Sequence, residues 1–200
     1  MEMPESSQDP NEPMPLASER RMVRWDAIAA IIASFIGLLA LIVAGYTAYI
    51  ERQQVRAQVW PYLQMGKSDA QGQYEFVAVN KGMGPVIVKS VQVLVSGTPV
   101  RNWNKLEHLL GFHPKGGQVT STLNGLVLAP GDKIRWIAFK NADDVDALIE
   151  GWSRFHVQAR VCYASTLGEA WLTVYQMGPL ASPRPVSNCG EIPAEAQFSN

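Results

Sequence analysis

The chain has 200 residues, of which 47% are hydrophobic and 18% are charged, and its formal net charge is −1. This length allows one ordinary domain with attachments. The charged residues are unevenly spread, because none occurs from Ala27 to Ile50. That gap argues against a wholly soluble protein and against a disordered chain. No segment is basic enough to predict nucleic-acid binding, which needs several clustered phosphate contacts.

The first residues are predicted to be disordered. Residues 1–19 contain four prolines and five acidic residues but hardly any bulky apolar side chains. Such a segment cannot bury enough surface to offset the conformational entropy that it would lose on ordering. We therefore expect residues 1–24 to form a disordered cytoplasmic tail.

Ala27 to Ile50 are predicted to form a transmembrane helix. A helix of these 24 residues extends about 36 Å, against a hydrocarbon core of about 30 Å. Trp25 at one end and Tyr46 and Tyr49 at the other are expected to anchor the helix at headgroup level. The stretch is longer than the roughly 7–15 residues of a signal-peptide core and begins late, which favours an uncleaved signal anchor.

The basic residues around this segment bear on its orientation. Three arginines lie in residues 20–24, and Arg52 and Arg56 lie within about 15 residues of the other end. Counting out to about 20 residues adds Lys67 and makes a tie. The two cysteines favour an exterior C-terminal domain, because disulfides persist in oxidising compartments. We predict a cytoplasmic N-terminus and a periplasmic C-terminal domain.

Small residues recur along the predicted span. Small side chains let helix backbones approach closely, so they predict a packing face for a second copy of the chain or for a membrane-protein partner. Alanine and glycine are also common in membrane helices without any such role, and the sequence leaves both interpretations open. The stripe consists of Ala29, Ala33, Gly37, Ala40 and Ala44.

The helix is expected to continue as a juxtamembrane extension, giving one helix over residues 25–58. Residues 51–58 are good helix formers, and Pro61 forbids further helix. From residue 59 onward, apolar and polar residues alternate in short stretches separated by Gly and Pro, which is typical of antiparallel sandwiches and barrels. The expected strands are residues 74–79, 86–95, 126–128, 133–138, 154–161 and 171–175.

Two segments, residues 104–110 and 143–152, depart from this alternation and are expected to form short helices. The fold class that follows is one N-terminal transmembrane α-helix followed by a mainly-β antiparallel sandwich with short helical insertions. The sandwich is expected to occupy residues 59–179 as an extracytoplasmic domain. Residues 180–200 contain several prolines and are expected to be an extended or loose tail.

Cys162 and Cys189 are the two cysteines of the chain. An even count in a domain outside the cytoplasm predicts one disulfide, and two separate thiols are the alternative. The bridge would close a loop of about 27 residues and stabilise the domain by roughly 3 kcal/mol in the chain-entropy model. It would also pin the start of the tail to a strand.

No catalytic residue, cofactor site or metal site is predicted. Gly82 and Gly84 precede a valine-rich strand rather than a helix, so they do not form a dinucleotide-binding fingerprint. His108 and His113 are five residues apart, whereas metal ligands on one helical face are three or four apart.

Two further stretches carry a resemblance. Residues 55–63 read VRAQVWPYL directly after the predicted span, and residues 80–85 read NKGMGP before a valine-rich stretch. The combination resembles uncharacterised bacterial single-span membrane-anchored proteins with an RAQVWPYL-like stretch after the span and a β-rich domain. The resemblance covers the span and roughly the first half of the domain. It implies a location in the bacterial inner membrane and brings no activity or site with it.

The predicted membrane anchor and the lack of a catalytic motif lead us to expect a membrane-anchored interaction or accessory module without catalytic activity and without a cofactor. Its partners would be the lipid bilayer and, through the helix, a second copy or a membrane protein. The alternative is a membrane-tethered small-ligand receptor or hydrolase-type enzyme, with a polar site assembled from scattered residues such as His108, His113 and Arg135. A deep pocket containing those groups would favour the alternative.

Overall fold

The structure, a computed structural model, describes residues 19–70, 73–177, 182–190 and 192–199. Helix α1 (Glu19–Gln58) is 40 residues long, and its part from Trp25 to Gln58 is long and apolar enough to cross a membrane. Residues 19–24, which we expected in the disordered tail, are helical; residues 1–18 of that expected tail lie outside the described residues. The chain divides into two compact units, residues 1–52 and 53–200, so the last turns of α1 belong to the second unit.

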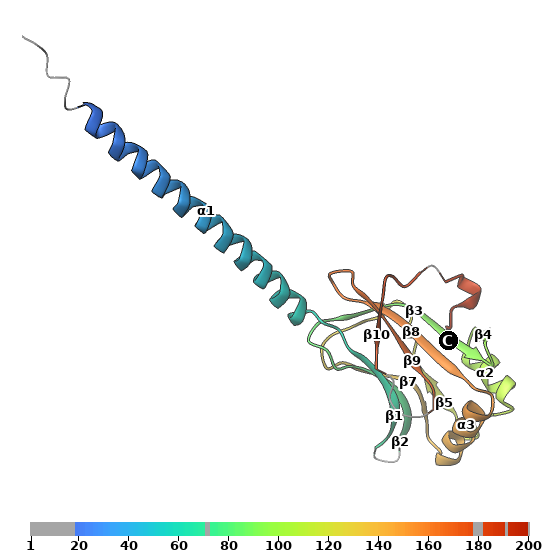
Figure 1. Cartoon of the computed structure of the whole chain (residues 1–200). Coiled ribbons are helices and arrows are strands. Elements are labelled where there is room, and N and C mark those ends of the chain that lie inside the picture. Colours follow the sequence, from blue (N-terminus) through green and yellow to red (C-terminus); the bar gives the residue numbers. More distant parts are fainter. Residues whose placement is uncertain (1–18, 71–72, 178–181, 191, 200) are drawn as a thin grey trace, which may run out of the picture. The chain divides into compact units, whose positions relative to one another are not determined.

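The second unit is built on two antiparallel sheets (Figure 1). The mainly-β antiparallel class expected from the alternation is confirmed. The first sheet has the order β1 (Leu63–Ala70), β2 (Gln73–Asn80), β7 (Lys133–Phe139), β5 (Gln118–Thr120). The second has the order β10 (Arg184–Val186), β9 (Ala170–Tyr175), β8 (Gln158–Ala164), β3 (Val86–Val95), β4 (Thr98–Val100), with β6 (Val127–Leu128) also paired to β3.

The two expected short helices are present as α2 (Trp103–Leu110) and α3 (Ala142–Arg154). The Asn102 side chain caps α2 by accepting from the N–H of Lys105 at 2.9 Å. The strand expected over residues 154–161 begins only at Gln158, because α3 extends to Arg154. His156 adopts a positive φ of 50° just after the helix, and the N–H of Val157 donates to the carbonyl of Trp152 at 3.0 Å, as in a Schellman-type helix end.

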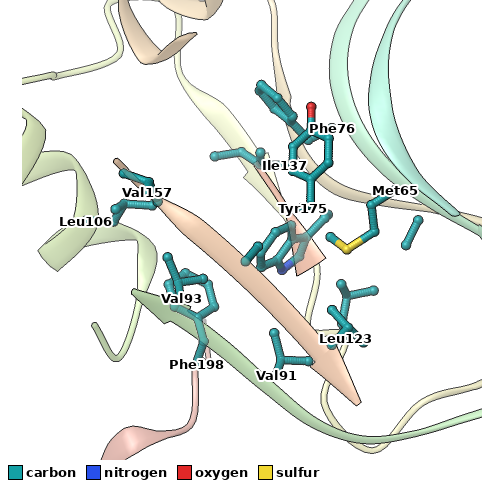
Figure 2. Packing of buried hydrophobic residues seen from close by; sticks show 14 of the residues in the cluster. Met65, Phe76, Val91, Val93, Leu106, Leu123, Ile137, Val157, Tyr175 and Phe198 are labelled. Carbon is teal, nitrogen blue, oxygen red and sulfur yellow. The ribbon is translucent and has the colours of Figure 1, made fainter. Parts of the chain in front are cut away.

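One hydrophobic core lies between the two sheets and is rich in aromatic side chains. Phe76 stacks on Trp152 with ring centroids 6.0 Å apart, and Tyr175 meets both rings edge-on. Figure 2 shows Phe76 and Tyr175 close together at one side of this core, with Phe198 beside Val93 at another. Among the described residues, side chains therefore fill the space between the two sheets.

The C-terminal segment was expected to be an extended or loose tail, and its described residues pack on the domain. Phe198 is buried against Trp103 and Trp136, at centroid distances of 5.1 and 5.6 Å, and its N–H donates to the carbonyl of Val91 at 2.8 Å. Residues 184–186 add strand β10 to the edge of the second sheet. Cys162 on β8 and Cys189 form a disulfide, with their Cα atoms 5.5 Å apart. The domain thus extends well beyond residue 179.

One end of the two-sheet domain receives the chain from α1, and we call it the helix-entry end. There, Leu63 at the start of β1 pairs with Asn80 at the end of β2. Ala164, at the end of β8, pairs with Ile87 near the start of β3 and with Ala170 at the start of β9. Helices α2 and α3 lie at the opposite end, since each follows or precedes strand ends that are paired there (Figure 1).

Candidate functional site at the helix-entry end

The residues directly after α1 are held by the loop that follows the neighbouring strand β2. We call Val59–Tyr62 the entry segment, Asn80–Pro85 the clamp loop, and the two together the entry clamp. Within it, the N–H of Lys81 donates to the carbonyl of Tyr62 at 2.8 Å. The N–H groups of Met83 and Gly84 both donate to the carbonyl of Trp60, at 3.0 and 3.1 Å. The two stretches that carried the resemblance thus contact each other in the fold.

Asn80 is the central side chain of the entry clamp, and it is fully buried. Its amide nitrogen donates to the carbonyls of Gly84 and Leu128, at 2.8 and 3.0 Å. Its amide oxygen accepts from the N–H of Gly82 at 2.9 Å. Both side-chain N–H groups and the oxygen are therefore used, which satisfies the amide in a site without water access.

The two glycines of the clamp loop are required by close backbone approach. A Cβ atom at Gly84 would overlap the backbone of Val59, and one at Gly82 would overlap the carbonyl oxygen of Trp60. The colliding atoms belong to backbone, so they cannot swing aside as the tip of a long side chain would. Any side chain at either position must push the entry segment away from the loop.

The turn between β8 and β9 also reaches the end of α1. Arg56 Nε lies 3.2 Å from a carboxylate oxygen of Glu169, and both side chains are partly exposed. An exposed pair of this kind contributes only about 0–1 kcal/mol. It nevertheless shows that the turn carrying Leu167 lies beside the last turn of the helix.

Exposed apolar side chains gather around the entry clamp. Trp60 is 46%, Met83 71%, Val127 61% and Leu167 50% exposed. They come from four separate segments: the entry segment, the clamp loop, strand β6, which pairs with the first residues of β3, and the β8–β9 turn. We call these four residues the entry rim.

The opposite end holds a polar cavity of about 350 Å³ between α2 and α3. His113, Lys115, Glu150 and Arg154 contribute to its lining. The carboxylate of Asp144, also in the lining, is buried and accepts from the N–H groups of Lys115 and Gly116 at 3.0 Å each, so it is occupied in holding the loop before β5.

The three residues of the alternative polar site are not brought together. His113 lines the α2–α3 cavity, whereas His108 is exposed on α2. Arg135 lines a different cavity and points its Nε toward a carboxylate oxygen of Glu75 at 3.7 Å, where Lys133 also pairs. Among the residues that the structure describes, no group of three or more His, Cys, Asp or Glu side chains could hold a metal ion.

Glu107 is a buried acid that sequence reasoning missed. Burial raises the pKa of its carboxyl, and the hydrogen bond with Gln118 and the charge of His113 lower it to a lesser degree. One carboxyl oxygen of Glu107 and the amide oxygen of Gln118 have no hydrogen-bond partner. The signal was present in the sequence, because Glu107 lies four residues after Trp103 and three before Leu110, on the apolar face of α2.

The residues proposed to act within the membrane all lie on α1 with their side chains exposed. This holds for the five small residues of the stripe and for Trp25, Tyr46 and Tyr49. A Cβ atom at Gly37 would meet no atom within 4 Å in the single chain. The packing role of the stripe and the anchoring role of the aromatic residues stay predictions.

Comparisons of the chain with protein-family models, with curated proteins and with solved structures gave no match. The resemblance of residues 55–63 and 80–85 to bacterial membrane-anchored proteins therefore stays a prediction. The function is inferred below from the geometry of the described residues.

Proposed function

We propose that the protein is a single-pass, membrane-anchored interaction or accessory module. In this proposal α1 crosses the bacterial inner membrane with the N-terminus in the cytoplasm. The two-sheet domain then lies in the periplasm as a non-catalytic module that meets other membrane components. The length and apolar character of Trp25–Gln58 support the span. The Cys162–Cys189 disulfide supports an oxidising compartment for the domain.

The observation that carries the proposal is the entry clamp. Helix α1 ends at Gln58, and the clamp begins at Val59. No Gly/Ser-rich tether therefore lies between the end of α1 and the clamp. A domain anchored to the membrane in this way meets partners in or on the same membrane at a high effective concentration.

Membrane anchoring and orientation are tested first. Full-length chain should remain in the membrane fraction after alkaline carbonate washing. Alkaline phosphatase fused behind the C-terminus should be active, whereas a cytosolic reporter fused at the same place should not. Release of the intact chain without detergent would contradict anchoring, and the reverse reporter pattern would contradict the orientation.

The module function is tested by loosening the clamp. A flexible Gly/Ser insertion between Gln58 and Val59 should abolish the discrete adducts, with a partner or a second copy, that chemical crosslinking yields in intact membranes. The matched control carries the same insertion between Ser96 and Gly97, in the exposed β3–β4 turn, and should keep the adducts. The proposal would be contradicted if the wild-type chain formed no adduct. It would also be contradicted if the insertion after Gln58 left the adducts unchanged.

The α2–α3 cavity supports a second candidate, a membrane-tethered receptor for a small charged ligand. At about 350 Å³ it lies at the lower end of the usual range for ligand pockets. Its lining carries the bases Lys115 and Arg154 and the acids Asp143, Asp144 and Glu150, so it suits a small zwitterion with both an ammonium and a carboxylate group. Free amino acids should then raise the unfolding temperature of the wild-type chain but not of Arg154→Ala, and an equal effect on both would exclude this candidate.

A further inference from the structure

We propose that the entry rim rests in the headgroup layer of the bilayer, so that the β-domain itself contacts lipid. This inference rests on the proposed function, because it requires that α1 spans the membrane. It adds a lipid-binding surface on the β-domain itself. The occupant is the interfacial layer of a phospholipid bilayer.

The first argument is where the apolar surface lies. Among the described residues from 53 to 199, the large hydrophobic side chains that are exposed are Val55, Trp60, Met83, Leu109, Val119, Val127 and Leu167. Single exposed apolar residues are normal on a soluble domain. Here, however, four segments that are distant in sequence each place one exposed apolar residue at the helix-entry end. Val55, at the end of α1, comes before these four residues in the chain. Such a gathering indicates an interaction surface.

The second argument is the length of chain between the span and the rim. Arg56 follows Ile50 by six residues, which is about 9 Å along a helix. The β8–β9 turn reaches Arg56 through Glu169, and Leu167 lies at the tip of that turn. Only this short stretch of chain separates the apolar stretch from the turn, so the chain keeps Leu167 near the membrane surface.

The third argument is the chemistry of the rim. Trp60 packs edge-on against Tyr62 with centroids 5.3 Å apart, and amphipathic rings of this kind prefer the headgroup level. The exposed Lys81 adjoins Met83, and a basic residue near anionic lipid contributes about 1 kcal/mol. Of the acids at this end, Glu169 pairs with Arg56, and the exposed Asp132 accepts from the N–H of Ala129 at 2.8 Å.

The test uses full-length chain in nanodiscs of phosphatidylethanolamine and phosphatidylglycerol. Leu167→Cys and Met83→Cys are each labelled with an environment-sensitive fluorophore, without reductant so that the native disulfide is kept. Leu109→Cys, an exposed position on α2 at the opposite end, is the matched control. Labels at 167 and 83 should emit at shorter wavelength than the label at 109, and lipids carrying a headgroup-level quencher should quench them more strongly.

Equal emission and equal quenching at all three positions, in chain that remains bound to the nanodiscs, would overturn the lipid contact and leave the anchoring proposal intact. Loss of nanodisc binding would overturn both. Protection of positions 83 and 167 only in native membranes, with none in pure lipid, would overturn the lipid contact in favour of a protein partner. Unfolding temperatures equal to wild type show that each variant is folded.

Discussion

The side-chain amide of Asn80 donates to the carbonyl of Leu128, 48 residues further along the chain, at 3.0 Å. This bond ties the loop after β2 to strand β6, and the same nitrogen also holds Gly84. Asn80 therefore links the end of β2, the loop at Gly84 and strand β6 at the place where the chain enters the domain.

Asn80→Ala is expected to destabilise the domain by about 2–4 kcal/mol, because several buried backbone groups lose their only side-chain partner. Urea unfolding followed by tryptophan fluorescence measures the change. Asn188→Ala is the control, since Asn188 is exposed and bonds only locally to Gly190. If both variants unfolded at the same urea concentration, Asn80 would not have the central role assigned to it.

Gly84→Ala is expected to open the entry clamp, because the new methyl group overlaps the backbone of Val59. Overpacking of this kind costs about 1–3 kcal/mol. Trypsin should then cleave after Arg56 faster than in the wild type, as the entry segment detaches from the loop. In the control Gly45→Ala, the added methyl group has no atom within 4 Å, and cleavage should be unchanged. Unchanged cleavage in Gly84→Ala would contradict the clamp.

Glu107→Gln is expected to stabilise the protein at neutral pH by on the order of 1 kcal/mol, because it removes a buried charge with an unpartnered oxygen. Burial raises the pKa of Glu107 above its ordinary value near 4.5, so the folded state holds this proton more tightly than the unfolded state. The stability due to this proton is complete below about 4.5 and is lost as the pH rises through the folded-state pKa.

Unfolding free energies measured between about pH 4 and pH 8 check this prediction. The difference between Glu107→Gln and wild type should grow with pH and then level off. Glu150→Gln, at an exposed position on α3, should follow the wild-type profile. Parallel profiles for wild type and Glu107→Gln would show that Glu107 does not titrate with folding.

Gly37→Leu is expected to weaken any association that uses the small-residue stripe on α1, because a bulky side chain keeps two helix backbones apart. The single chain should tolerate the change, since Gly37 has open space around it. Native gels of detergent-solubilised membranes measure the effect, with Ile36→Leu as the volume-conserving control. Complexes of unchanged size in Gly37→Leu would exclude the stripe as a packing face.

The local elements were largely predictable, because their signals are local. The charge-free stretch predicted an apolar helix, and the alternation around Phe76 and Val91 predicted β2 and β3. Strand β1 was missed because its residues from Gln64 to Ser68 are mostly polar. β1 lies at the edge of its sheet, where a polar strand is well tolerated.

The long-range features were not predictable from one sequence. The residues around Trp60 and those around Gly84 each stood out, but their contact depends on how β1 and β2 pair. Phe198 is the one aromatic residue in residues 180–200, which are rich in proline and polar residues, so nothing local indicated that it packs against Trp103 and Trp136. The buried Glu107 was the exception, since its position on the apolar face of α2 was readable.

The entry clamp has a mechanical consequence. Its hydrogen bonds and glycine contacts fix the peptide groups immediately after the last turn of α1. Torsion applied to residues 53–58 is therefore transmitted into the loop at Gly84 rather than dissipated by free bond rotation. Through the Asn80 amide it reaches strand β6, which pairs with β3 of the second sheet.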